Sequence, residues 1–154
     1  MQNNSPSLFA VTEVELVYRN KVKPADRLKI MSPENAYDAF LNAWDLSKID
    51  LVEQFYLLMV DRAQNCLGIA HLFTGGTSSC LVDPKIIFAM ALKANASSIF
   101  IAHNHPSGNL TPSKADTLLT EKIKAGADIL DIKLQDHLIV RPLNYYSFAE
   151  NGLI

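Results

Sequence analysis

The sequence has few of the features that mark disulfide-stabilised or membrane-spanning proteins. It contains only two cysteines, Cys66 and Cys80. They do not form a Cys-x-x-Cys pair, so neither a structural zinc knuckle nor a disulfide framework is indicated. The longest apolar run, residues 86–92, is far too short to cross a bilayer. Residues 1–7 are polar and lack the basic and apolar regions of a secretory signal. We therefore expect a cytoplasmic protein with no membrane association.

An excess of charge of one sign is also missing. The formal net charge is −2, so no overall field would draw the chain to nucleic acid. One local basic cluster consists of Arg19, Lys21, Lys23, Arg27 and Lys29, with Asp26 among them. We interpret it as a solvated strand end or loop. Direct DNA binding is an alternative that the charge does not support.

The composition and the pattern of apolar residues indicate one folded α/β domain. Hydrophobic residues make up 49% of the 154-residue chain and charged residues 19%, which favours a packed core over disorder. We expect an N-terminal tail and strand over residues 1–30 and the folded domain over 31–154. Helices and strands alternate without a Gly-x-Gly-x-x-Gly fingerprint, which predicts a central mixed β-sheet flanked by helices.

Local signals place the individual elements. Apolar patterns predict strands over residues 9–22, 50–60, 66–73 and 98–102, and one or two more over 130–140. Ser32-Pro33 and Asp83-Pro84 are typical helix starts, and a third helix should run from Ser113 to the region of Gly126. In the second helix, the side chains that should face the core are those of Ile87, Met90, Ala91 and Ala94. The tail over residues 142–154 should pack back on the domain.

Two histidines follow the strand predicted over residues 98–102. Side chains at positions i and i+2 of an extended segment point the same way, so His103 and His105 can coordinate one metal ion together. Asp116 can supply a third ligand if the intervening loop folds back. Two histidines and one carboxylate, with a coordination position left open, are typical of a catalytic zinc site rather than a structural one.

Each of these residues also has a simpler interpretation. Ser113 and Asp116 form a Ser-x-x-Asp pattern that is nearly a capping box, and a capping role can coexist with a role at a metal. Asn104 should point away from the two histidines, toward the backbone of neighbouring strands. His71 is expected to be packed in a strand. His137 is expected to be a core residue or a partner of a ligand rather than a ligand itself.

The spacing His-x-His-x7-Ser-x2-Asp, from His103 to Asp116, matches the motif of the JAMM (JAB1/MPN/Mov34) metalloproteases. Residues 103–108, Asp136-His137 and the closing residues 147–152 resemble the bacterial RadC family more closely. The resemblance covers residues 50–154 well and implies a RadC-like JAB domain with the JAB/MPN, cytidine-deaminase-like three-layer architecture. It leaves no room for a complete N-terminal helix-hairpin-helix module.

The resemblance also implies an upstream glutamate in a Glu-x-Phe context, which Glu53 fits. A plain surface acid at a strand end is the simpler interpretation of that residue. In the implied chemistry, Zn²⁺ held by His103, His105 and Asp116 lowers the pKa of a water molecule. Glu53 is then the general base, and Ser113 donates to the developing oxyanion. The expected reaction is hydrolysis of a peptide or isopeptide amide bond in an unidentified peptide or protein.

Three other functions compete with this one. The RadC name is traditionally linked to DNA repair and mobile elements, so an accessory protein without proteolytic activity is the main alternative. A catalytically silent interaction module would be expected to have lost ligands, and none is missing here. A zinc deaminase is disfavoured because the chain has no Pro-Cys-x-x-Cys pair.

Overall fold

A computed structural model describes Arg19 and residues 21–154 of the chain. The strand predicted over residues 9–22 therefore lies almost wholly outside the described residues. In the described part, a five-stranded sheet has the order β2-β1-β3-β4-β5. The strands are β1 (Gln54–Val60), β2 (Cys66–Thr74), β3 (Ser98–His103), β4 (Lys133–Arg141) and β5 (Asn144–Ser147). The three α-helices are α1 (Pro33–Ala43), α2 (Pro84–Lys93) and α3 (Lys114–Ile129).

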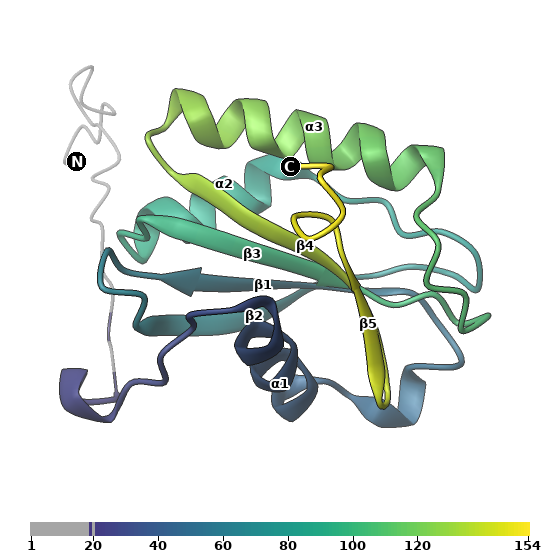
Figure 1. The fold of residues 1–154 in the computed structure, drawn as a ribbon, viewed down its shortest axis with the longest axis horizontal. Helices are drawn as coiled ribbons and strands as arrows, with labels where there is room; N and C mark the ends of the chain where they lie inside the picture. Colours follow the sequence, from purple (N-terminus) through teal and green to yellow (C-terminus); the bar gives the residue numbers. More distant parts are fainter. Residues whose placement is uncertain (1–18, 20) are drawn as a thin grey trace, which may run out of the picture.

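The sheet is mixed, as the alternation of elements predicts. β1 pairs antiparallel with both β2 and β3, β3 pairs parallel with β4, and β5 returns antiparallel to β4. Among the described strands, the only parallel pair is β3 with β4, and α3 connects these two strands because parallel neighbours need a long crossover. This pairing places the carboxyl end of β3 beside β1 and β4, in the middle of the sheet (Figure 1).

Helices cover both faces of the sheet and give the predicted three layers. β1 is buried along its whole length, and its alternate side chains enter two separate cores. Tyr56 and Leu58 pack in the core that includes Phe40 of α1. Phe55 and Leu57 pack in the core that includes Ile87 of α2 and Ile123 of α3. The architecture is thus α1 on one face and α2 with α3 on the other.

Side-chain caps start the helices where the sequence predicts. Ser32 Oγ accepts a hydrogen bond from the Asn35 backbone N–H at 3.2 Å, and Asp83 Oδ1 accepts one from the Lys85 N–H at 2.9 Å. Each cap satisfies a backbone donor that the first helical turn leaves unpaired.

Two helix details differ from the prediction. Met90 is 36% exposed, because Ile87, Ala91 and Ala94 occupy the inner stripe of the second helix and Met90 falls at its edge. Helix α3 continues through Gly126 to Ile129. A Cβ at Gly126 would lie 2.7 Å from Phe88 Cε2, so this glycine allows close packing of α2 on α3 rather than ending the helix.

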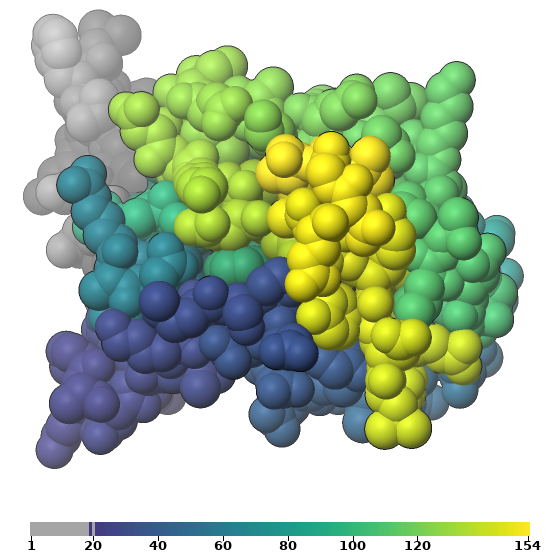
Figure 2. Space-filling view, in the orientation of Figure 1, coloured from purple at the N-terminus to yellow at the C-terminus, as the bar shows by residue number. Residues whose placement is uncertain are grey.

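The C-terminal segment packs back on the domain, as predicted. β5 adds an edge strand, and Phe148 is fully buried behind it. Figure 2 shows this segment in yellow, lying between the green surface of α3 and the dark blue surface of α1. In the part of the chain that the structure describes, no helix is both long enough and apolar enough to span a membrane.

Candidate metal centre

The two histidines of the His-x-His pattern converge at the end of β3. His103 is the last residue of the strand and is buried, whereas His105 lies in the following loop and is partly exposed. Their Nε2 atoms are 2.9 Å apart. The expectation that both rings point the same way is therefore confirmed.

Asp116 reaches the same point from the first turn of α3. Its Oδ1 lies 3.2 Å from His103 Nε2, and its Oδ2 lies 3.4 Å from His105 Nε2. The three side chains each offer one ligand atom, and these atoms all lie within 4.8 Å of one another. The loop over residues 104–113 thus folds back as the metal hypothesis requires.

A capping box fixes Asp116 at the start of α3. Ser113 Oγ accepts from the Asp116 backbone N–H at 3.1 Å, and Asp116 Oδ2 accepts from the Ser113 backbone N–H at 2.7 Å. The capping interpretation and the convergence on the histidines therefore hold together. Burial disfavours the ionised carboxylate, but hydrogen bonds from His103 and His105 outweigh it and hold the Asp116 pKa well below its usual range.

Hydrogen bonds on the far side of each imidazole set its orientation. His105 Nδ1 lies 2.7 Å from the Asn109 carbonyl oxygen, which can only accept, so Nδ1 carries a proton. His103 Nδ1 lies 2.8 Å from His137 Nε2. The hydrogen bond between His105 and Asp116 raises the pKa of His105. Complete burial lowers the pKa of His137 well below its ordinary value.

Buried hydrogen bonds from Asn104 tie the histidine segment to the start of β1. Its Oδ1 accepts from the Gln54 backbone N–H at 2.7 Å, and its Nδ2 donates to the carbonyls of Ile49 and Val52 at 2.6 and 2.9 Å. Asn104 therefore points away from the two histidines and serves neighbouring backbone, as predicted.

A second hydrogen bond holds the middle of the loop over residues 104–113. Arg141 Nη1 donates to the Gly108 carbonyl at 2.9 Å. The φ of Gly108 is +76°, a backbone conformation that residues with a Cβ atom rarely adopt. Glycine at this position lets the loop turn back toward α3.

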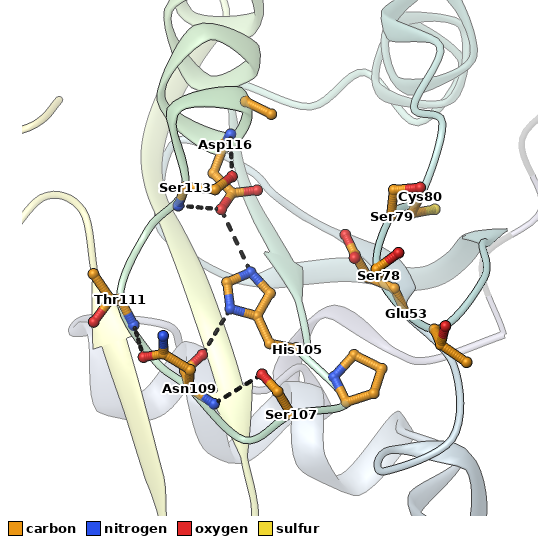
Figure 3. A pocket seen from close by; sticks show the side chains of 13 residues that line it. Glu53, Ser78, Ser79, Cys80, His105, Ser107, Asn109, Thr111, Ser113 and Asp116 are labelled. Carbon is orange, nitrogen blue, oxygen red and sulfur yellow. Dashed lines mark hydrogen bonds and ion pairs between the residues drawn. The ribbon is translucent and has the colours of Figure 1, made fainter.

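Glu53 lies opposite His105 and Asp116, across a cavity of about 360 Å³. Figure 3 shows Glu53 and residues 78–80 on one side, with His105, Ser113 and Asp116 on the other. The Glu53 backbone is held by hydrogen bonds with Gly75 and Gly76 at 2.8 and 2.9 Å. Burial raises the Glu53 pKa, and the nearby histidines oppose that shift.

The lining of the cavity is rich in hydroxyl groups. It includes Thr77, Ser78, Ser79, Ser107, Thr111 and Ser113, together with the thiol of Cys80. Burial and the neighbouring Glu53 raise the pKa of Cys80 to about 11, so the thiol is protonated at neutral pH. The described residues that line the cavity include no lysine and no arginine.

The donor set fits a divalent transition metal. Two imidazole nitrogens and a carboxylate oxygen suit zinc and leave room for water or substrate. Each imidazole has its Nδ1 engaged on the outer side, as metal-bound histidines usually do. His103, His105 and Asp116 would be the ligands, and zinc would act as a Lewis acid at the wall of the cavity.

The structure separates the remaining histidines from the cluster, but one of them differs from its prediction. His71 lies in β2 and outside the cluster, as expected, yet it is exposed rather than packed, because β2 is an edge strand. Its ring stacks on Tyr56 at 4.8 Å between centroids. His137 is buried and contacts His103 through Nε2. Thr120, which contacts His137 Nδ1 at 2.6 Å, did not stand out in the sequence. Its position four residues after Asp116, on the same face of a helix, is the signal that could have found it.

Fold and site together define a three-layer α/β domain with a candidate metal centre at the end of its central strand. The family model of the RadC-like JAB domain matches residues 30–153. The chain belongs to this family.

Three curated relatives illustrate the similarity. A UPF0758 protein of Flavobacterium johnsoniae is 35% identical over 143 residues, which cover 93% of this chain and 62% of the relative. The UPF0758 protein YfjY of Escherichia coli is 40% identical over 66% of this chain and 64% of its own length. A UPF0758 protein of Thermotoga maritima is 42% identical over 62% of this chain and 43% of its own length. The matched region thus spans less than two thirds of each of these relatives.

Proposed function

We propose that this protein is a zinc-dependent hydrolase of the JAMM type that cleaves a peptide or isopeptide amide bond. The observation that carries the proposal is the convergence of two imidazole Nε2 atoms and one carboxylate within 4.8 Å of one another. Two of these residues, His105 and Asp116, line a cavity that Glu53 also lines. When bound, zinc would acidify a water molecule and polarise the carbonyl under attack.

Glu53 is suited to be the general base. It is half-buried across the cavity from His105 and Asp116, and its raised pKa makes its carboxylate a stronger base than that of an ordinary surface glutamate. It would accept the proton of the attacking water and return it to the leaving amine.

Ser113 is suited to stabilise negative charge on the substrate oxygen. The capping box uses its Oγ as an acceptor from the Asp116 N–H, so the hydroxyl hydrogen can still be donated. Its position at the N-terminus of α3 adds the positive end of the helix dipole.

The charge of the cavity supports a neutral amide substrate over a phosphate-bearing one. Its described lining contains the carboxylates of Glu53 and Asp116 but no lysine or arginine, whereas proteins that bind nucleic acid contact phosphates with Lys and Arg. Of the basic cluster, Arg27 lies 3.7 Å from the Asp61 carboxylate and Lys29 donates to the Ala63 carbonyl. The DNA-repair accessory alternative thus gains no support from this site.

The experiment that tests the proposal is metal analysis followed by an activity assay. The protein is purified without chelator or nickel resin, and metal content is measured for wild type, His103→Ala and the matched control His71→Ala. We expect about one zinc per chain in wild type and His71→Ala, and loss in His103→Ala. Wild-type protein is then assayed on peptide and lysine-linked isopeptide libraries.

Absence of zinc from the wild type, with no uptake on addition, would overturn the metal site. Zinc binding without hydrolysis of either library would overturn the peptidase assignment and favour a non-proteolytic role.

A further inference from the structure

A continuous line of buried hydrogen bonds runs from the backbone of α3 to the ring of His103. Thr120 Oγ1 lies 2.7 Å from the Asp116 carbonyl oxygen and 2.6 Å from His137 Nδ1. On its other side, His137 Nε2 lies 2.8 Å from His103 Nδ1. Thr120, His137 and His103 are each exposed by 2% or less, so water does not compete for these contacts.

The direction of the protons follows from the one group in this line that can only accept. The Asp116 carbonyl has no hydrogen, so the single hydroxyl hydrogen of Thr120 points to it. A lone pair of Thr120 Oγ1 then faces His137 Nδ1, which must carry a proton. If the Thr120 hydroxyl donated to His137 instead, Thr120 Oγ1 and the Asp116 carbonyl oxygen would lie 2.7 Å apart with no hydrogen between them, which is repulsive.

The proton position on His137 fixes the direction of its hydrogen bond with His103. Its ring is fully buried, stacked on Phe148 at 4.5 Å and edge-on to Phe55 at 6.2 Å between centroids, in surroundings that favour the neutral imidazole. A neutral imidazole with its proton on Nδ1 has an acceptor lone pair on Nε2. His103 must therefore donate from Nδ1, and its own Nε2 is left to face His105 and Asp116.

We propose that Thr120 and His137 form a positioning relay that holds His103 in the Nδ1-protonated form and keeps its Nε2 available as a metal ligand. This inference rests on the metal site of the proposed function. His137 is a positioning residue and not a ligand, because both of its nitrogens are engaged within the relay.

The two histidine ligands thus obtain the same proton arrangement in different ways. For His105 the acceptor on the outer side is the Asn109 backbone carbonyl, at 2.7 Å. For His103 it is a second imidazole, which accepts only while its other nitrogen keeps its proton. Thr120 is the group that keeps it there, so a side chain on α3 controls a ligand on β3.

A direct test reads the imidazole nitrogens by ¹⁵N NMR at fixed pH, in zinc-loaded and in chelator-treated wild-type protein. We expect a proton on Nδ1 and none on Nε2 of His137 in both samples, and a proton on Nδ1 of His103. A proton on Nε2 of His137 would overturn the relay. This measurement needs no variant and no activity.

A matched pair of variants tests the consequence for metal binding. Thr120→Val keeps the shape but removes the hydroxyl, so the His137 proton is no longer held on Nδ1, whereas Thr120→Ser retains the hydroxyl. Loss of such outer partners typically weakens metal binding by about 10- to 100-fold. We expect at least about a tenfold loss of zinc affinity in Thr120→Val and near wild-type affinity in Thr120→Ser, by competition with a chelator.

Denaturant unfolding of both variants in chelator separates this effect from loss of the fold. Equal zinc affinities in the two folded variants would overturn the relay, and the wild-type NMR measurement decides the matter if Thr120→Val does not fold. Failure of wild type to bind zinc would overturn the proposed function, while the His137 tautomer in metal-free protein would still decide the relay. Zinc binding without hydrolysis would count against the peptidase activity alone.

Discussion

Ser113 and Asp116 exchange two hydrogen bonds, and the same Asp116 carboxylate faces both histidines of the cluster. One oxygen, Oδ2, accepts the Ser113 backbone N–H and also lies 3.4 Å from His105 Nε2. The start of α3 and the candidate metal centre therefore share one side chain, that of Asp116.

Two substitutions should separate these roles. Asp116→Asn keeps an oxygen for the cap but removes the negative charge, so we expect zinc affinity to fall by at least about tenfold, because even changes in outer partners have effects of that size. Ser113→Ala should retain zinc, lower turnover, and destabilise the helix start by about 1 kcal/mol. Zinc titration and denaturant unfolding of both variants check this. Unchanged zinc affinity in Asp116→Asn would contradict the ligand assignment.

Glu53→Gln should leave zinc bound and remove turnover. The amide keeps the size of the side chain but cannot accept the proton of water, and the loss of a general base typically lowers turnover by about 10²- to 10⁴-fold. The matched control is Glu121→Gln on the exposed surface of α3, which should behave as wild type. Metal content and kcat on a cleaved peptide are the measurements. Full activity in Glu53→Gln would exclude it as the base.

Zinc affinity should weaken as the pH falls. The hydrogen bond with Asp116 raises the His105 pKa above its ordinary value of 6.5, so below that raised pKa a proton occupies the nitrogen that zinc needs. Uptake should therefore release a proton, and the apparent affinity should decline as the pH drops through the raised His105 pKa. Calorimetry in buffers of different ionisation enthalpy measures this proton. Affinity that stays constant down to pH 5 would contradict the expectation.

Asn104→Asp should destabilise the protein severely. The substitution removes the Nδ2 donor and sets a buried negative charge against the carbonyls of Ile49 and Val52. Leaving buried partners unpaired costs about 1–3 kcal/mol each, and the charge adds to it, so we expect a loss of about 3 kcal/mol or more. Asn144→Ala, at the exposed first residue of β5, should change the unfolding free energy by less than about 0.5 kcal/mol. Urea unfolding compares the two, and equal stabilities would contradict the role given to Asn104.

Local patterns in the sequence predict most of the fold and the three residues that converge at the candidate metal centre. The cap-and-proline signals at Ser32 and Asp83 depend on neighbouring residues alone, and so does the placement of His103 and His105 on one side of an extended segment. Glu53 could be found only by resemblance to a known family, since nothing in its local pattern distinguishes it from other acids at strand ends.

Features that depend on tertiary packing were not predicted. Gly126 suggests a helix end locally, but the close approach of Phe88 explains it instead. Thr120 acquires its significance only when β4 brings His137 beside α3. Likewise, the serines of residues 78–79 line the cavity because the loop after β2 folds beside Glu53, which no periodicity specifies.

The hydrogen bonds of Asn104 indicate which part of the cavity can vary with the substrate. Asn104 joins the peptide groups next to Glu53 to the strand end that carries the histidines, so the backbones on the two sides of the cavity are tied together at its base. Residues 78–80 lie on the Glu53 side of the cavity and belong to no helix or strand. Adjustment to different substrates is therefore expected in residues 78–80, and members of the family with different preferences should differ there while keeping the hydrogen bonds of Asn104.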